Sequence, residues 1–225
     1  LAQNLIEELQ CETVFTIPVL GGIPVSEAVV VTWIIMAVLV VIAFILTRNL
    51  KVDHISKRQA VAESIVTGLL NMVQGMVGEK GKAYVPYLTT VMLYIGVSNI
   101  IGLFGFKSPT KDLRVTVALA LMSIILIEAA GIYHKGVKRW LHGFVEPVAI
   151  VTPINILEVV TKPLSLCMRL FGNVLGAFVI MELLKMILPV GLPVVFSLYF
   201  DIFDGLLQAY VFVFLTSLYI DEITE

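Results

Sequence analysis

The sequence predicts an all-α membrane protein with about five membrane-embedded helices, including a long C-terminal helical hairpin and amphipathic interfacial helices. Of its 225 residues, 59% are apolar and only 14% are charged, whereas soluble domains are close to half apolar. The charges gather at the ends of long uncharged runs, and no internal repeat, heptad pattern or low-complexity segment is present. Lipid is therefore the expected solvent, and residues 1–225 are predicted to form a single membrane domain.

Composition and motifs exclude several classes of function. The net charge of -2 argues against a broadly basic nucleic-acid binder. Cys11 and Cys167 lack metal-ligand spacing and are predicted to be free thiols. There is no phosphate-binding glycine loop, zinc pattern or serine nucleophile motif. We therefore expect no cofactor, no metal and no ATP chemistry on this chain itself.

Three runs have the length of a spanning helix, since about 20 apolar residues cross a hydrocarbon core of roughly 30 Å. An outer N-terminal segment, residues 1–27, precedes them. The runs are residues 28–47, 83–106 and 115–133. Glu128 interrupts the third run, and we expect it to have a structural role by pairing with His134 or Lys135.

Positive clusters follow the first and third runs, which places these regions on the cytoplasmic side. The clusters are Arg48, Lys51, Lys57 and Arg58, and then Lys135, Lys138 and Arg139. A smaller cluster lies in loop 107–114, and residues 60–77 are typical of an amphipathic or part-buried helix. The N-terminus is thus expected outside and the C-terminus in the cytoplasm. Residues 1–27 do not resemble a targeting peptide, which favours a bacterial plasma membrane over an organelle inner or thylakoid membrane.

The last third of the chain is predicted to form a helical hairpin. Pro147 and Pro153 suggest a broken interfacial helix over residues 143–162. Two long helices follow, and proline and glycine mark the turn between them. The predicted helices are residues 163–188 and 192–219.

This hairpin contains charged residues within otherwise apolar membrane helices. Each costs roughly 2.5–3.5 kcal/mol at the centre of a membrane helix. They are Arg169, Glu182, Lys185, Asp201 and Asp204. Such groups mark ion pathways or form internal salt bridges, for example between Arg169 and Asp204, and charge alone leaves both interpretations open.

Helical spacing favours a pathway. One face at i, i+3, i+4 and i+7 carries Arg169, Gly172, Asn173 and Gly176. Its glycines allow another helix to pass close by. A second stripe, suited to a file of water or ions, carries Asp201, Asp204 and Gln208.

Four further polar residues have less certain roles. Glu182 and Lys185 are three residues apart near the turn, and for Lys185 we favour a surface pair, while the role of Glu182 stays open. Asn155 and Glu158 are candidates for an inner aqueous mouth, although a plain interfacial helix explains them equally well.

A family resemblance rests on three segments of the sequence. Residues 162–173, KPLSLCMRLFGN, resemble the signature of the F-type ATP synthase a subunit, typically K-P-x-S-L-x-x-R-L-F-G-N. Two further segments agree, SPTKDLRVTVALA at 108–120 and LQAYVFVFLT at 207–216. The resemblance covers most of the chain and is weakest before residue 83.

The resemblance implies a stator that conducts H⁺ or Na⁺ through two offset half-channels to and from the carboxylates of a c-subunit ring. The family's essential arginine falls on Arg169, which would separate the half-channels. Its asparagine falls on Asn173 and its last-helix glutamine on Gln208. Asp201 stands where the family usually has Glu or His.

One position departs from the family pattern. Phe178 stands where Glu or His is common, and Glu182 or Asp204 are expected to substitute for it, which rearranges the outer half-channel. Asn155 and Glu158 would then lie near the inner exit, and Gly172 and Gly176 would face the c-ring. The implied partners are the c-ring, peripheral stalk b subunits, other ATP synthase subunits and membrane lipid, with no nucleic acid. Competing interpretations are a self-contained secondary ion transporter and a purely structural membrane anchor.

Overall fold

The structure is a computed structural model that describes residues 13–17, 23–48, 56–104, 106–143, 152–187 and 191–224. In this part of the chain, five helices are long and apolar enough to span a membrane. They are Glu27–Thr47, Gly81–Phe104, Leu113–Lys135, Thr152–Met186 and Val195–Thr224. The predicted all-α membrane fold with about five membrane-embedded helices is confirmed.

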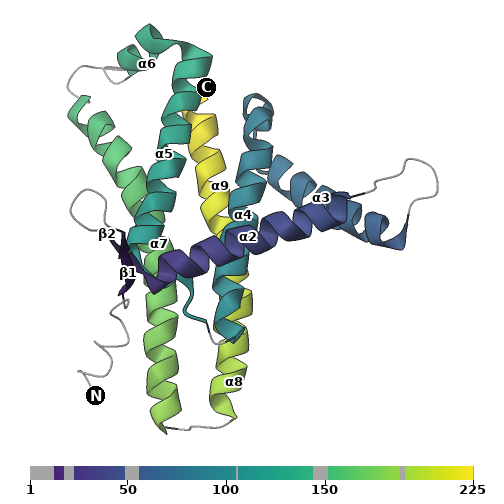
Figure 1. Cartoon of the computed structure of the whole chain (residues 1–225). Helices are drawn as coiled ribbons and strands as arrows, with labels where there is room; N and C mark the ends of the chain where they lie inside the picture. The colour runs from purple at the N-terminus through teal and green to yellow at the C-terminus, as the bar shows by residue number, and fades with distance from the viewer. Residues whose placement is uncertain are drawn as a thin grey trace.

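A small sheet precedes the helices. Strands β1 (Thr13–Ile17) and β2 (Ile23–Ser26) pair antiparallel, and β2 leads directly into α2 (Glu27–Thr47). The buried Ser26 hydroxyl donates a 2.8 Å hydrogen bond to Asp112 Oδ2 and so fastens the sheet to a later loop. Figure 1 shows α2 crossing the other long helices obliquely. Most of its large apolar side chains are exposed, which suits a helix surrounded by lipid.

The chain between α2 and the C-terminal hairpin alternates long helices with short helical turns. Its elements are α3 (Lys57–Gln74), η1 (Glu79–Tyr84), α4 (Val85–Ile100), η2 (Ile101–Phe104), η3 (Pro109–Lys111), α5 (Leu113–Lys135) and α6 (Val137–Gly143). The helix α3 corresponds to the amphipathic segment expected at 60–77, and α5 to the run expected at 115–133. Cys11 and the centre of the first positive cluster lie outside the described residues.

The core forms where α4, α5 and α9 (Gly205–Thr224) run side by side (Figure 1). Ile95 on α4, Ile127 on α5 and Phe212 on α9 are buried almost completely, and Leu170 of the hairpin joins them. Burying a side chain of this kind contributes about 1.5–3 kcal/mol relative to exposure in water. In lipid the same contacts act through close packing instead.

The first hairpin helix is longer than the sequence suggested. Helix α7 is continuous over Thr152–Ile187 with Pro163 inside it, so the expected interfacial break is wrong for residues 152–162. Pro153 lies in the first turn, where no backbone donor is needed. Pro163 removes one internal hydrogen bond, which membrane helices tolerate. Pro147 lies outside the described residues.

The second hairpin helix has three parts. A short α8 (Leu192–Ser197) leads into a seven-residue π-helix, η5 (Leu198–Asp204), which continues as α9. Gly191 precedes α8 with a φ of 90°, a left-handed conformation that favours glycine. The π-helix was not anticipated from the sequence, and both Asp201 and Asp204 lie on it. Such segments often occur at functional sites.

Gly205 allows α9 to approach α4 closely. A Cβ built on Gly205 would lie 2.8 Å from Asn99 Cβ, whereas one built on Gly68 of α3 would meet nothing within 4 Å. We expect Gly205→Ala to destabilise the protein by about 1–3 kcal/mol through overpacking. Gly68→Ala is the matched control and should be neutral or stabilise by about 0.5–1 kcal/mol. Denaturant titration of the detergent-solubilised protein measures the difference, and equal stability of the two variants would contradict the proposed contact.

Candidate ion pathway

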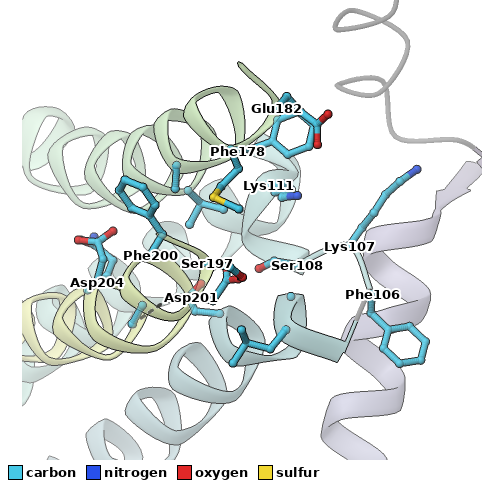
Figure 2. Close-up of a pocket in the computed structure, with 18 of the residues that line it drawn as sticks. Phe106, Lys107, Ser108, Lys111, Phe178, Glu182, Ser197, Phe200, Asp201 and Asp204 are labelled. Atoms are coloured by element: carbon cyan, nitrogen blue, oxygen red, sulfur yellow. Dashed lines mark hydrogen bonds between the residues drawn. The ribbon is translucent and has the colours of Figure 1, made fainter. Parts of the chain in front are cut away.

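Most, but not all, of the predicted polar residues of the hairpin line one cavity. It has a volume of about 360 Å³ and lies between η2, the loop carrying η3, the C-terminal half of α7, and the second hairpin helix (Figure 2). Four predicted pathway residues line it: Glu182, Asp201, Asp204 and Gln208. The stripe expected from helical spacing therefore faces a hollow rather than packed side chains.

The two aspartates of the π-helix have different surroundings. Asp201 Oδ2 accepts a 2.6 Å hydrogen bond from the Ser197 hydroxyl. Gly102 lets this carboxylate approach, since a Cβ there would lie 3.2 Å from Asp201 Oδ1. Asp204 has no hydrogen bond or ion pair within the described part of the chain, and Figure 2 shows it lying apart from Asp201 on the same helix. Of the two aspartates, Asp204 thus has fewer polar contacts that hold its carboxylate in place.

Asn173 and Gln208 connect the two hairpin helices. Asn173 Nδ2 donates a 2.6 Å hydrogen bond to Gln208 Oε1. The Gln208 side chain is only 2% exposed, and its Nε2 finds no hydrogen-bond partner among the described residues. A buried donor of this kind is costly unless water or another group reaches it. Gln208 thus offers a free donor beside the cavity.

Arg169 points away from any internal partner. It is exposed, and within the described residues it forms no ion pair, so the salt bridge with Asp204 considered above is absent. A Cβ built on Gly172 or Gly176 would meet nothing within 4 Å, and Asn173 between them is also exposed. The predicted face of α7 therefore has no cover from the described part of the chain.

Three lysines line the same cavity, two of them in ion pairs. Lys107 Nζ lies 3.0 Å from Glu27 Oε2, and Lys185 Nζ lies 2.6 Å from Glu182 Oε1. The expected Glu182–Lys185 pair is therefore present. Lys111 Nζ instead lies 4.0 Å from the centre of the Phe178 ring, a cation–π contact. Burial lowers the pKa of Lys111, and the Asp201 charge partly opposes this shift.

A chain of buried hydrogen bonds holds the walls of the cavity. Asn99 on α4 is central: its Nδ2 donates to the Gly205 carbonyl at 3.0 Å, and its Oδ1 accepts from Thr110 Oγ1 at 2.7 Å. Ser108 Oγ lies 2.7 Å from Thr110 Oγ1 and donates to the Ser98 carbonyl at 2.7 Å. The loop with η3, helix α4 and the start of α9 are therefore fastened to one another.

A second polar cavity lies near the other end of α7, between α6 and the end of α9. Figure 1 shows these three helix ends in the upper part of the view. It has a volume of about 310 Å³, and both Asn155 and Glu158 line it. Lys162 bridges two carboxylates there, with Nζ 3.0 Å from Glu222 Oε2 and 3.8 Å from Glu158 Oε2. The two predicted inner-mouth residues thus share a cavity distinct from that of the aspartates.

Glu128 also lines the second cavity, with a partner other than those expected. Its Oε2 accepts a 2.9 Å hydrogen bond from Trp140 Nε1, so the pairing with His134 or Lys135 is wrong. The cause is α6, which follows Gly136 (φ 77°) and carries Trp140 back toward α5.

Sequence reasoning missed several residues of the first cavity. Lys111, Asn99, Ser108 and Ser197 were not identified as site residues. The sequence does contain a signal for Lys111, because this residue lies within the segment 108–120 of the family resemblance. Asn99 and Ser197 gave none, since single polar residues at the ends of apolar helices are common.

Known proteins resemble this chain over most of its length. The family model described as ATP synthase A chain matches residues 29–221. ATP synthase subunit a of Moorella thermoacetica is 35% identical over 203 residues, covering 89% of this chain and 92% of that protein. The sodium ion specific ATP synthase subunit a of Propionigenium modestum is 34% identical over 215 residues, covering 88% and 74%. ATP synthase subunit a 1 of Crocosphaera subtropica is 30% identical, covering 87% and 85%. With a family model over most of its length and relatives of this similarity, the chain belongs to the ATP synthase subunit a family.

Proposed function

We propose that this chain conducts ions through two offset half-channels, one for each polar cavity, to and from a ring of c subunits. The observation that carries the proposal is the order of features along α7. The second cavity is lined by α7 residues up to Lys162, the first by α7 residues from Val174 onward, and Arg169 lies between them. Neither half-channel crosses the membrane alone, so an ion has to leave one cavity, travel on the ring and enter the other.

The outer half-channel is the cavity at the π-helix. Glu182, Asp201 and Asp204 supply carboxylates that exchange ions with water, and Gln208 with Asn173 leads from the cavity to the exposed face of α7. Asp204 is the main exchange group, because Ser197 holds Asp201 and Lys185 holds Glu182. The inner half-channel is the cavity containing Asn155 and Glu158.

The c-ring lies against the uncovered face of α7. Arg169 faces a c-subunit carboxylate that has lost its ion, which offsets the cost of roughly 2.5–3.5 kcal/mol for a bare charge in lipid. The same cation repels an ion that would otherwise leak directly between the half-channels. Gly172 and Gly176 leave room for a ring helix to slide past.

Membership of the family means that the chain works within the membrane sector of an ATP synthase together with its other subunits. ATP is bound elsewhere in the complex, so the chain is not an enzyme by itself. One elementary charge crossing 100 mV releases about 2.3 kcal/mol, so several ions are needed for each ATP. H⁺ and Na⁺ are both candidates, because the relative from Propionigenium modestum is described as sodium ion specific.

The surroundings of the chain follow from the same assignment. We place it in a bacterial plasma membrane with its N-terminus outside, its C-terminus in the cytoplasm, and b subunits and lipid at its remaining surfaces. A self-contained secondary transporter is disfavoured by the family assignment, and the sequence lacks the paired repeats of such proteins. A purely structural anchor gains nothing from an exposed Arg169 in the middle of a long apolar helix.

Replacement of Arg169 tests the separation of the half-channels. In the assembled ATP synthase, Arg169→Ala is expected to lower ion-driven ATP synthesis about hundredfold, the factor that corresponds to an uncompensated charge in lipid. The complex should still assemble, because Arg169 has no partner in the described chain. Lys57→Ala, at the exposed start of α3, is the control and should retain synthesis. Ion-driven synthesis by vesicles with Arg169→Ala at a rate close to that of Lys57→Ala would refute the role assigned to Arg169.

Replacement of Asp204 tests the outer half-channel. Asp204→Asn keeps the size of the side chain but removes the exchangeable charge, so ATP-driven pumping should fall at least about tenfold. The control is Glu63→Gln on α3, whose carboxylate accepts a hydrogen bond from Gln59 away from both cavities. Fluorescence quenching of a pH-sensitive dye in reconstituted vesicles measures pumping. Equal pumping by both variants would remove Asp204 from the pathway.

The two partners of the Glu182–Lys185 ion pair can be replaced one at a time, and the pumping rates of the two variants can be compared. Each variant, Glu182→Gln or Lys185→Gln, breaks the same 2.6 Å ion pair, so a purely structural role predicts equal and mild losses. We expect the loss of pumping to be larger for Glu182→Gln, because only its carboxylate exchanges ions. The ratio of the two pumping rates is the relevant measurement, and a ratio near one would assign Glu182 to structure alone.

A further inference from the structure

In the part of the chain that the structure describes, one cation of the outer cavity has no carboxylate within ion-pair distance. Three lysines line this cavity, and Lys107 and Lys185 are held in ion pairs with Glu27 and Glu182. Within the described residues Lys111 forms no ion pair, and its ammonium group is instead held over the Phe178 ring. Figure 2 shows Lys111 between Phe178 and the group formed by Ser197 and Asp201.

The backbone that carries Lys111 is fixed on both sides. The residue before it, Thr110, is fully buried and donates to Asn99 Oδ1 at 2.7 Å. The residue after it, Asp112, is also buried, accepts a hydrogen bond from Ser26 and caps α5 through the Arg114 N–H at 2.9 Å. These contacts hold the backbone of Lys111 beside the cavity, and the contact with the Phe178 ring holds its ammonium group at the cavity wall.

Lys111 faces the carboxylates of the proposed outer half-channel. Its ammonium group shares this cavity with the carboxylates of Asp201 and Glu182 and with the ammonium groups of Lys107 and Lys185. With Asp204, the cavity has three carboxylates and three lysines. Because Lys107 and Lys185 are offset by Glu27 and Glu182, the charges left on the lining are those of Asp201, Asp204 and Lys111. Lys111 therefore halves the negative charge that would otherwise concentrate metal cations in this cavity.

We propose that Lys111 makes the outer cavity selective for protons over alkali-metal cations. This inference rests on the proposed function, since it assumes that the cavity is the outer half-channel. A proton passes by exchange between water and carboxylates and needs no vacant cation position. Na⁺ has to enter as an ion and be coordinated by oxygen ligands. The Lys111 ammonium group repels Na⁺ and offsets the negative charge of Asp201 that would attract it.

The ligands available to a metal cation agree with the proposed selectivity for protons. Within the described residues, no group of three or more His, Cys, Asp or Glu side chains lies close enough to hold a metal ion. Phe178 contributes a ring that stabilises an ammonium but offers Na⁺ no oxygen ligand. Lys111 and Phe178 together thus fill the place where a metal cation would need anionic oxygen atoms.

Pumping at different Na⁺ concentrations tests the proposal. ATP synthase containing this chain is reconstituted into vesicles, and ATP-driven proton pumping is recorded while choline replaces Na⁺ at constant ionic strength. The wild type should be insensitive to Na⁺. In Lys111→Met and Lys111→Gln, Na⁺ should inhibit pumping about threefold or more, because removal of one charge at this range raises the local cation occupancy by at least that factor.

Two controls separate charge from structure. Lys111→Arg keeps a cation that can lie over Phe178 and should remain insensitive to Na⁺. The double variant Glu27→Gln/Lys107→Met removes a lysine from the same cavity together with the carboxylate that neutralises it, so the net charge is unchanged and pumping should also remain insensitive. Inhibition of this double variant equal to that of Lys111→Met would overturn the assignment to Lys111.

The remaining outcomes are also decisive. Pumping that requires Na⁺ in the wild type, or Na⁺-insensitive pumping in both Lys111→Met and Lys111→Gln, would overturn the proposal. Asp204→Asn distinguishes this failure from failure of the proposed function. If Asp204→Asn stops pumping while the Lys111 variants stay insensitive to Na⁺, the cavity is the pathway and only its selectivity is misassigned. If Asp204→Asn pumps normally, the pathway itself lies elsewhere.

Discussion

A polar group in the hydrocarbon region has to find its partner inside the protein, because lipid offers none. In this chain that constraint is met chiefly by Asn99, whose amide joins α4 to the loop with η3 and to the start of α9. The position of the loop determines where Lys111 lies, and the position of α9 determines where the π-helix places its aspartates. The cavity at the π-helix therefore depends on a few buried hydrogen bonds between neutral groups. These bonds hold in place the backbone segments that carry its charged residues.

The π-helix is a second consequence of the same constraint. Its i→i+5 hydrogen bonds satisfy the backbone while turning side chains by a different angle from an α-helix. Asp201 and Asp204 both line the cavity, yet Asp201 accepts a hydrogen bond from a hydroxyl, whereas Asp204 has no hydrogen-bond partner within the described residues. Two chemically identical residues three positions apart thus differ in how firmly the protein holds their carboxylates.

Much of this arrangement was predictable from the sequence, because lipid imposes strict rules on length and charge. The long apolar runs predicted the membrane helices, and spacing alone brought Asp201, Asp204 and Gln208 to one stripe. The continuous course of α7 through Pro163 was not predictable, since membrane helices tolerate a proline that would end a helix in water. The position of Lys111 in the cavity was not predicted because it depends on contact with Phe178, which is distant in sequence and belongs to another helix. The partner of Glu128 was missed for a similar reason, since the turn at Gly136 decides where Trp140 lies.

The hydrogen bond between Ser26 and Asp112 joins residues that are 86 positions apart. During synthesis, β2 emerges long before the loop that receives it. The N-terminal sheet therefore cannot dock until α4 has been inserted and Asp112 has reached the same side of the membrane. Asp112 also caps α5, so the contact that anchors the start of the chain forms together with the turn that opens the third membrane crossing. Docking of the N-terminus therefore follows insertion of the first half of the protein.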